Sequence, residues 1–267
     1  MTDLVVLEHV SLAAHTTLKV GGTARYFITA TTEEGVAQAV QFAKERQLPL
    51  FVLGAGSNVL ALDGEYAGVV LNISILGKKA VVDTEAGTVL LTVGAGENLD
   101  TIIADTVLSG WWGMENLSAI PSSIGAVPVQ NVGAYGVEAS QLIVSVRVYN
   151  GQTEQLETWT AAACQFAYRD SVFKHEAGRS AIVLAVTFQL SVTPVPRLLY
   201  KDLAHYFGET TPTQQAIRDA VMAIRKKKFP DWHVVGTAGS FFKNPIIPAE
   251  HALLLTEQYP DLPTYDT

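Results

Sequence analysis

The chain has 267 residues, of which 48% are hydrophobic and 16% are charged, and its formal net charge is −8. A chain of this length buries about three quarters of its unfolded surface, so it is large enough for one to three domains with substantial cores. The acidic balance excludes a general nucleic-acid binder, which needs a broad basic face, and the longest apolar run, residues 181–186, is too short to cross a bilayer.

The N-terminus and the single cysteine bear on cellular location. Asp3 stands where a secretory signal peptide carries basic residues. Cys164 has no second cysteine with which to form an internal disulfide, and its neighbours resemble neither a metal cluster nor an activated thiolate, so we interpret it as structural. We therefore expect a cytoplasmic protein.

The spacing of apolar residues predicts an α+β protein with mixed sheets. Helices are expected at residues 31–46 and 99–107 and from residues 211–214 up to Pro230, and strands at 50–53, 68–71, 89–93, 144–149, 152–158 and 181–190. The first helix is expected to open on a capping box from Thr31 to Glu34. The pair Asn150-Gly151 predicts a tight hairpin whose two turn residues both have positive φ.

Residues 116–138 are rich in prolines, amides and small side chains, which predicts a long loop rather than an ordinary helix or strand. Such a loop either wraps an extended ligand or packs on itself as an Ω-loop. Its low charge and many backbone donors favour the ligand. We place domain boundaries near residues 72 and 215, which gives parts 1–72, 73–215 and 216–267.

The turn Gly54-Ala55-Gly56-Ser57-Asn58 follows a predicted strand. It lacks the third glycine of the dinucleotide fingerprint and the Gly-Lys-Ser/Thr of a Walker loop. Its backbone N–H groups can still cradle a pyrophosphate, and a plain turn is the equal alternative. The chain also has a run of basic residues, Arg225-Lys226-Lys227-Lys228. These cations either match the negative end of a helix dipole, which is the simpler interpretation, or contact a phosphate.

The stretch Gly236–Pro245 has the composition of a reaction pocket. Glycines allow close approach to a ligand, Phe241 and Phe242 exclude water, and a lysine and an amide follow. Ser240 is therefore the candidate proton donor. A glycine-rich turn that enters a buried strand is the alternative.

Arg169 lies among aromatic residues, where it is suited to bidentate contact with a carboxylate. Its neighbour Asp170 offers an internal ion pair, and on local grounds we favour that pair slightly. The six histidines show neither HExxH nor an i,i+4 pair, so no metal site is expected. Ser240 lacks the G-x-S-x-G elbow, which disfavours a Ser-His-Asp hydrolase.

Four motifs in a fixed order resemble those of the UDP-N-acetylenolpyruvoylglucosamine reductases, also called UDP-N-acetylmuramate dehydrogenases. The motifs are residues 53–60, 120–136, 168–171 and 239–245, and the resemblance runs from about His15 to the last residue. It implies an FAD-binding fold of the vanillyl-alcohol-oxidase (PCMH) type. Two N-terminal parts would hold FAD, and a C-terminal substrate-binding domain would be only partly present.

The resemblance also implies a reaction and its setting. NADPH reduces FAD, which then reduces UDP-N-acetylglucosamine enolpyruvate to UDP-N-acetylmuramate. This oxidoreductase step belongs to peptidoglycan precursor synthesis and so to cell wall biogenesis, cell shape, cell division and the cell cycle. We expect a monomer with no nucleic-acid or membrane partner.

Individual site residues follow from the same resemblance. FAD contacts are expected from Gly54, Gly56, Ser57, Asn58, Ile120, Pro121, Gly125, Gln130, Asn131, Gly133 and Ala134. Substrate contacts are expected from Tyr135, Tyr200, Lys228 and Asn244. Arg169 would stabilise the negative charge that develops on the carbon beside the substrate carboxylate, and Ser240 would protonate that carbon.

The chain departs from the family pattern at two places. Ser122 stands where the family usually has glycine, close to the expected pyrophosphate. The family also continues for several dozen residues beyond the equivalent of Thr267 and supplies a catalytic glutamate there, so we expect the natural chain to be longer. Two alternatives follow: a flavin oxidase of the same fold with another substrate, and a flavin-binding fragment without turnover.

Overall fold

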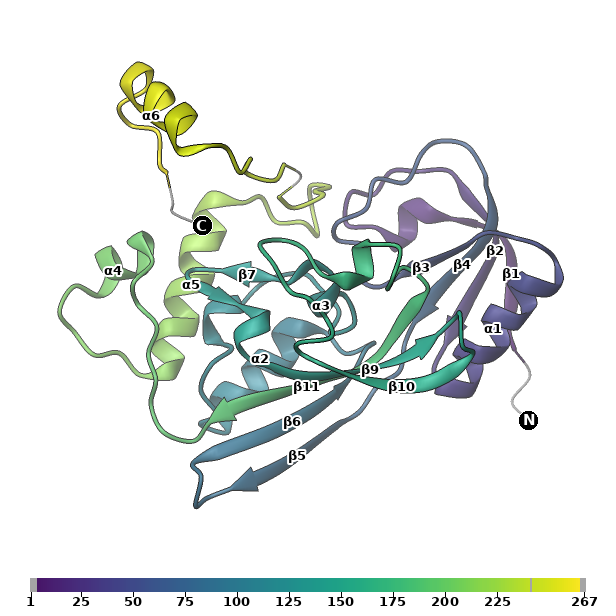
Figure 1. Ribbon diagram of the computed structural model, residues 1–267, viewed down its shortest axis with the longest axis horizontal. Helices are drawn as coiled ribbons and strands as arrows, with labels where there is room; N and C mark the ends of the chain where they lie inside the picture. The colour runs from purple at the N-terminus through teal and green to yellow at the C-terminus, as the bar shows by residue number, and fades with distance from the viewer. Residues whose placement is uncertain (1–3, 241, 265–267) are drawn as a thin grey trace.

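The computed structural model describes residues 4–240 and 242–264, and these form two main β-sheets with helices packed around them (Figure 1). The first sheet is mixed and has the order β1-β2-β4-β3. Its strands are β1 (Val6–Ser11), β2 (Thr23–Ala30), β3 (Leu50–Leu53) and β4 (Tyr66–Ile73). β1 runs antiparallel to β2, whereas β4 is parallel to both β2 and β3.

The second sheet is antiparallel throughout and has the order β10-β9-β11-β6-β5. Its strands are β5 (Lys78–Asp83), β6 (Thr88–Gly94), β9 (Ile143–Asn150), β10 (Gln155–Thr160) and β11 (Ala181–Ser191). A two-stranded ribbon of β7 (Gly133–Ala134) and β8 (Val137–Glu138) lies within the predicted long loop. The predicted α+β class is confirmed. One of the two main sheets is mixed, as expected, and the other is antiparallel.

Helix α1 (Glu33–Glu45) forms because a cap and an apolar face coincide. Its N-cap is Thr32, whose hydroxyl accepts a hydrogen bond from the Gly35 N–H at 3.0 Å. The predicted cap at Thr31 is therefore wrong by one residue, and glycine at the third helical position cannot complete a capping box. The predicted buried face is confirmed and consists of Val36, Ala39, Val40 and Ala43.

The hairpin of β9 and β10 is confirmed, but its predicted two-residue turn is wrong. Asn150 pairs with Gln155, so four residues form the loop. The Asn150 side chain accepts the Gln152 N–H at 3.0 Å, and Glu154 takes the positive φ, at 59°. The Asn150 side chain thus bonds its own loop, and the Asn150 backbone does not adopt the left-handed conformation.

The largest hydrophobic core runs continuously through both sheets. It joins residues of β2, α1 and β4 to residues of β6, β9 and β11, and it includes helix α2 (Leu99–Leu108). At its margin, Arg147 of β9 binds Glu33 of α1 through two hydrogen bonds of 2.5 and 2.8 Å. The two sheets therefore share one interior rather than forming two separately packed units.

Two further helices pack against the long loop on the side away from the first sheet. Helix α5 (Gln214–Lys228) begins at its N-cap Thr213, within the predicted start of residues 211–214, and buries Ile217, Ala220 and Val221. Together with Leu203 of α4 (Lys201–Phe207), these side chains form a smaller apolar cluster around Trp112 and Tyr135. This cluster attaches the basic helix to the loop that the sequence marked for a ligand.

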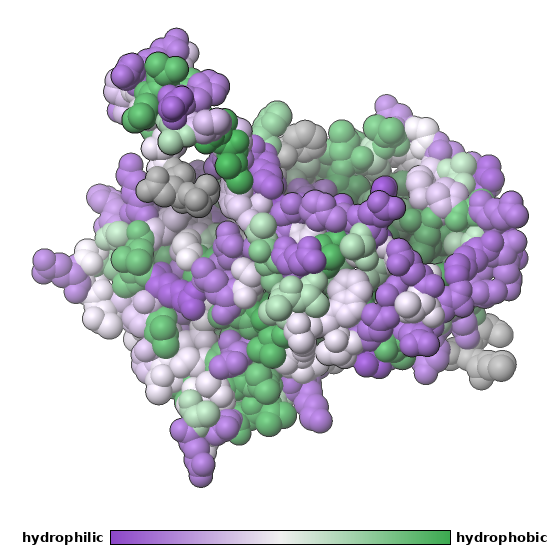
Figure 2. Space-filling model, in the orientation of Figure 1, coloured by the Kyte–Doolittle hydropathy of each residue, from purple (hydrophilic) through white to green (hydrophobic). Residues whose placement is uncertain are grey.

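The last helix, α6 (Ala249–Gln258), was not predicted, and none of its residues is buried. Figures 1 and 2 show it standing away from the rest of the molecule. The predicted long loop also contains a short helix, α3 (Ala126–Gln130), and single turns of 3₁₀ helix at η2 (Glu115–Leu117) and η3 (Ala139–Gln141). Two more such turns are η1 (Leu12–His15) and η4 (Val172–Lys174). Of the helices in the described ranges, none has the length and apolar character needed to span a membrane.

Cys164 provides a test of the shared core. It is fully buried, and burial raises the pKa of its thiol to about 11. The folded state thus keeps its proton at pH values where the unfolded thiol, near pH 9, has lost it. We expect the stability contributed by the neutral thiol to be complete below pH 9 and to be lost as the pH rises towards 11.

This loss is measured by urea unfolding at several pH values. The stability difference between the unsubstituted protein and Cys164→Ala should shrink by about 2 kcal/mol between pH 9 and pH 11, which is most of the roughly 2.7 kcal/mol that a shift of two pKa units supplies in total. A difference that stays constant from pH 8 to pH 11 would show that the thiol ionises normally in the folded protein.

Candidate flavin site

The turn Gly54–Asn58 and the long loop meet face to face. Gly54 lies so close to Ser123 that a Cβ atom added at Gly54 would be 2.4 Å from the Ser123 Oγ. Gly56 has a positive φ of 65°, and a Cβ atom there would lie 2.1 Å from the His15 carbonyl oxygen. Both glycines are therefore required by the packing, and the turn and the loop that the sequence marked separately form one cradle.

Ser123 supplies an unpartnered polar atom to this cradle. Its Oγ is buried and has no hydrogen-bond partner among the described residues. The neighbouring Ser122, the departure from the family pattern, instead turns its hydroxyl onto the Ser123 carbonyl oxygen at 3.1 Å. A buried hydroxyl without a partner is rare in folded proteins, and it suits a ligand oxygen placed over Gly54.

The second Gly-Ala-Gly turn, residues 94–98, supports the long loop from behind. The Gly125 N–H donates to the Ala95 carbonyl oxygen at 2.8 Å, and the Ile124 N–H donates to the Glu97 carbonyl oxygen at 2.9 Å. A Cβ atom at Gly125 would lie 2.9 Å from the Ala95 Cβ. The two similar turns thus have different tasks: the first faces the cradle, and the second fixes the loop that closes it.

The pocket motif reaches the cradle through the N-terminal segment. Thr17 and Thr237 exchange two hydrogen bonds, of 2.7 Å from the Thr17 hydroxyl and 3.0 Å from the Thr237 N–H. The Thr17 N–H in turn donates to the Gly56 carbonyl oxygen at 3.1 Å. A Cβ atom at Gly239 would lie 3.5 Å from the Ser57 carbonyl oxygen. Residues more than 170 positions apart are therefore neighbours at this site.

A cavity of about 530 Å³ opens beside the start of the first turn. Its wall combines hydroxyl, amide, cationic and aromatic side chains with small residues. The lining residues are Ala13, Ala14, His15, Thr16, Thr17, Lys19, Gly54, Ala55, Asn72 and Trp232. This mixture of polar groups and an indole is suited to a nucleotide-sized ligand that extends from the turn.

Arg169 lies next to Ser240. Its guanidinium donates to the carbonyl oxygens of Ser240 and Phe242, each at 2.5 Å. The Arg169 backbone has a φ of 48°, in the left-handed region that residues other than glycine rarely adopt. Phe241, the first of the two predicted aromatic residues, lies outside the described residues. The two predicted catalytic residues are thus brought together from positions 71 residues apart.

The ion pair between Arg169 and Asp170, which local sequence favoured, is wrong. Asp170 instead lies 3.1 Å from the Nε2 of His175 and accepts the Ser171 N–H at 2.9 Å. Desolvation acts to raise the pKa of the Asp170 carboxyl, but the hydrogen bonds from His175 and Ser171 outweigh it and hold the pKa below its ordinary value. With Asp170 held elsewhere, the Arg169 guanidinium is directed at the pocket motif.

Three of the four predicted substrate residues form a second group. The rings of Tyr135 and Tyr200 meet edge to face at 5.4 Å between centroids. Lys228 donates to Asp202 at 2.6 Å, which raises the pKa of its ammonium. Burial raises the pKa of the Tyr135 phenol, although the nearby cations Arg225 and Lys228 act in the opposite direction.

Arg225 belongs to this group but was not selected individually from the sequence. Burial lowers the pKa of its guanidinium, and a hydrogen bond to the Tyr135 phenol partly offsets that effect. A half-buried arginine beside two tyrosines is suited to a phosphate or another anion. The basic run from Arg225 to Lys228 indicated such a contact, but sequence alone did not show that Arg225 faces inward.

The other predicted residues differ in what their side chains do. Asn131 has a φ of 42° and uses its whole amide internally: it donates to Glu138 at 2.9 Å and to the Ala167 carbonyl oxygen at 3.0 Å, and it accepts the Ser140 N–H at 2.9 Å. Gln130 accepts a hydrogen bond from Lys174 at 2.8 Å. These two side chains hold the loop in shape.

The rest of the predicted set lies along the loops already described. Ile120, Pro121 and Ser57 are half-buried, Asn58 is exposed, and Gly133 and Ala134 form β7. Ser240 and Asn244 are exposed, and within the described part of the chain neither side chain makes a hydrogen bond. Asn244 is the predicted substrate residue for which no contact with the tyrosine group is found there.

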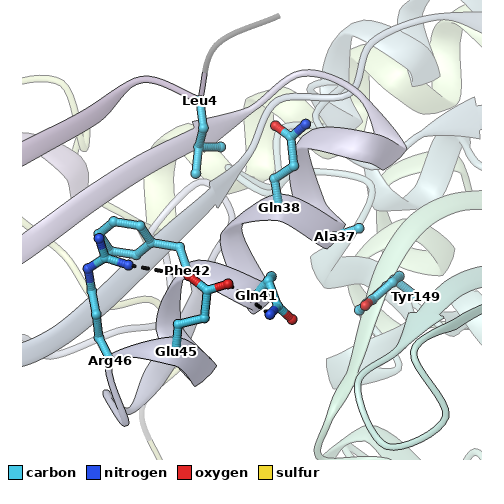
Figure 3. A pocket seen from close by; sticks show the side chains of 8 residues that line it. All are labelled: Leu4, Ala37, Gln38, Gln41, Phe42, Glu45, Arg46 and Tyr149. Atoms are coloured by element: carbon cyan, nitrogen blue, oxygen red, sulfur yellow. Dashed lines mark hydrogen bonds and ion pairs between the residues drawn. The ribbon is translucent and has the colours of Figure 1, made fainter. Parts of the chain in front are cut away.

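A shallow cavity of about 540 Å³ lies elsewhere, between α1 and the side chain of Tyr149 on β9 (Figure 3). It contains none of the residues that the sequence marked for chemistry. Its lining residues are Leu4, Ala37, Gln38, Gln41, Phe42, Glu45, Arg46 and Tyr149. Across residues 4–240 and 242–264, no group of three or more His, Cys, Asp or Glu side chains is arranged to hold a metal ion.

Comparison with known proteins shows which family of proteins shares this fold. The sequence model of a family described as FAD binding domain matches residues 24–158. A cholesterol oxidase from Brevibacterium sterolicum is 17% identical in sequence, has a TM-score of 0.55 and is matched over 72% of this chain and 38% of that one, which shows a shared fold. The chain therefore belongs to the FAD-binding proteins, and its fold is of the vanillyl-alcohol-oxidase type, as expected.

Relatives in one enzyme family match most of the chain. The UDP-N-acetylenolpyruvoylglucosamine reductase of Neisseria meningitidis serogroup C is 41% identical over 258 residues, which are 95% of this chain and 74% of that protein. That of Cupriavidus pinatubonensis is 42% identical over 97% of this chain and 76% of that protein. The crystal structure of the corresponding reductase from Thermus caldophilus is 26% identical in sequence, has a TM-score of 0.67, and is matched over 91% of this chain and 76% of that one. The chain belongs to the UDP-N-acetylenolpyruvoylglucosamine reductase family.

The cradle fits the cofactor that this class of protein binds. Gly54 and Gly56 let the turn pack directly against the long loop and the His15 carbonyl oxygen, and Ser123 places an unpartnered buried hydroxyl at that contact. Ser123 was not selected from the sequence, because a serine in a loop full of serines and amides carries no distinguishing local signal. Only its contact with Gly54, across 69 positions of the chain, reveals it.

Gly54→Ala tests the cradle. The added methyl group would force the Ser123 hydroxyl out of its position, and we expect FAD to bind about tenfold more weakly, equivalent to about 1.4 kcal/mol. Affinity is measured by titrating cofactor-free protein with FAD and following flavin fluorescence.

Gly64→Ala is the matched control, because a Cβ atom at Gly64 meets no atom within 4 Å. It should bind FAD like the unsubstituted protein. Equal affinities for the two alanine variants would place the cofactor away from Gly54.

Proposed function

We propose that this chain catalyses the FAD-dependent reduction of UDP-N-acetylglucosamine enolpyruvate to UDP-N-acetylmuramate, with NADPH as reductant. The relatives named UDP-N-acetylenolpyruvoylglucosamine reductase, at about 40% identity over most of the chain, support the substrate class. The product is a peptidoglycan precursor, which links the protein to cell wall synthesis, cell shape and cell division. A cytoplasmic monomer is consistent with soluble nucleotide substrates.

The observation that carries the proposal is the contact of Arg169 with the backbone of Ser240 and Phe242. It holds a cation beside the backbone of the residue that carries the candidate hydroxyl, next to the flavin cradle, and reduction of an enolpyruvyl ether needs both groups. In the described part of the chain, two of the five guanidinium N–H donors hold the pocket motif. The remaining donors are suited to the substrate carboxylate.

Bound FAD supplies hydride transfer from NADPH to the terminal carbon of the enolpyruvyl group. Arg169 would stabilise the negative charge that develops on the adjacent carbon and its carboxylate. Ser240 would then give its hydroxyl proton to that same carbon, which converts the enolpyruvyl ether into a lactyl ether. An alcohol is a weak acid, so it is a competent donor only to a carbon as basic as this one.

The tyrosine group is suited to the diphosphate end of the substrate. Lys228 and Arg225 provide positive charge, and the phenols of Tyr135 and Tyr200 provide hydrogen bonds. We propose that Asn244, four residues after Ser240, also contacts the substrate. The separation of a cationic diphosphate site from a catalytic arginine would orient the sugar between them.

The first experiment examines the protein with its cofactor. Purified with FAD, it should be yellow and should lose its visible absorbance when NADPH is added without oxygen. Addition of UDP-N-acetylglucosamine enolpyruvate should restore the colour. Colour that returns only with oxygen would favour a flavin oxidase, and NADPH oxidation that does not depend on the sugar would refute the substrate assignment.

Ser240→Ala separates the two halves of the reaction. The flavin needs no proton from Ser240 to accept hydride from NADPH, so we expect its reduction to stay within about twofold of normal. Sugar reduction, which needs that proton, should slow by about 10²–10⁴-fold. Stopped-flow absorbance measures both steps, and an equal loss in both would contradict the proposed role.

A further inference from the structure

The turn that carries Arg169 is narrow and bears an unusual backbone conformation. Ala167 and Asp170 exchange two backbone hydrogen bonds of 3.0 Å, with Tyr168 and Arg169 at the tip. A positive φ at arginine is unfavourable for a side chain with a Cβ atom. Such a conformation persists only where surrounding contacts hold it, so the groups that bond to this turn determine where the guanidinium lies.

Two of those contacts are made with the long loop of residues 116–138, here called the flavin loop, and both involve a buried side chain. The Ser171 hydroxyl donates to the Val129 carbonyl oxygen at 2.8 Å, and the Asn131 side chain donates to the Ala167 carbonyl oxygen at 3.0 Å. Ser171 and Asn131 are only 1% and 2% exposed. They fasten both ends of the turn to the loop, but neither reaches its tip.

Lys174 reaches the tip. Its ammonium donates to the Arg169 carbonyl oxygen at 2.7 Å and to the Gln130 side-chain oxygen at 2.8 Å. It thus bridges Arg169 to the loop residue between the two that hold the ends of the turn. The Lys174 side chain as a whole is exposed, so its replacement opens no cavity in the core.

The position of this ammonium has an electrostatic cost. Desolvation lowers the pKa of Lys174, the nearby cations Arg169 and Lys243 lower it further, and Asp170 only partly compensates. An exposed lysine is free to move away from two other cations. Lys174 stays among them because its two hydrogen bonds oppose that tendency, which indicates a specific positioning role rather than a solvated surface charge.

We propose that Lys174 is a positioning residue that couples the flavin loop at Gln130 to the Arg169 turn and so fixes the guanidinium against Ser240. The inference rests on the proposed function, because it concerns the arginine of that reaction. Lys174 itself touches neither substrate nor the reacting atoms. It acts through the backbone of Arg169, whose orientation decides whether the guanidinium meets the substrate carboxylate.

The test compares Lys174→Met, which keeps the aliphatic stem and removes the donor, with Lys174→Arg, which restores donors. We expect Lys174→Met to lower kcat for sugar reduction about tenfold and to raise KM for the sugar, while anaerobic flavin reduction by NADPH stays within about twofold. Lys174→Arg should recover most of the loss. Lys79→Met, an exposed lysine on the edge strand β5, is the control and should behave like the unsubstituted protein.

A double-mutant cycle distinguishes positioning from general destabilisation. If Lys174 acts through Arg169, Lys174→Met should have almost no further effect in an Arg169→Ala background, because coupled residues are not additive. The proposal would be overturned if Lys174→Met lowered kcat by the same factor with Arg169 present and with Arg169→Ala. It would also be overturned if Lys174→Met left kcat unchanged in a protein that is otherwise active.

Failure of the proposed function has a separate signature, since then even the unsubstituted protein would not oxidise NADPH in response to the enolpyruvyl sugar.

The visible spectrum of bound FAD gives a readout that needs no turnover. Because Gln130 lies in the flavin loop, Lys174→Met should shift that spectrum and Lys174→Arg should not. Identical spectra for the three proteins would also count against the coupling.

Discussion

The close approach of Gly54 to Ser123 is the contact on which the site depends. It brings a turn of the mixed sheet against a loop of the antiparallel sheet, and no residue with a Cβ atom fits between them without displacing the hydroxyl. Gly125 makes the same kind of contact with Ala95 on the other side of the loop. The cradle thus depends on positions without side chains. The two proposed catalytic residues are linked to it through neighbouring segments, Ser240 through the contact of Thr17 with Thr237 and Arg169 through the flavin loop.

Sequence predicted well where one local pattern dominated. The helices α1, α2 and α5 and the strands β3, β4, β6, β9, β10 and β11 were predicted from their apolar residues, whereas β1, β2 and β5 were not. It failed where a side chain had a choice of partner: Asn150 bonds its own loop, and Asp170 pairs with His175 rather than with adjacent Arg169. Short α3 was hidden in a segment rich in prolines and small residues. The motifs predicted which residues belong to the candidate site, but only the structure shows the contacts between distant segments that bring those residues together.

The basic residues of helix α5 have partners within the protein. The cations of its last turn, Arg225 to Lys228, suit the negative end of the helix dipole. Arg225 and Lys228 also have individual partners, as does Arg218 nearer the N-terminus. Arg218 binds Asp100 of α2 through two hydrogen bonds of 2.6 and 2.9 Å, and Lys228 binds Asp202 of α4. Between them, Arg225 faces the Tyr135 phenol. The helix therefore places its charges at set distances from the loop, which a solvated basic tail would not do.

The core shared by the two sheets ties the survival of the protein to its cofactor. Each sheet contributes one side of the cradle, so a dinucleotide bound there holds together both sides of the same interior. Because such a ligand binds only the folded chain, each tenfold rise in free FAD above its Kd adds about 1.4 kcal/mol to the stability of the whole unit. A cell short of riboflavin would then lose this protein to proteolysis as well as losing its activity, and the amount of protein would follow vitamin supply.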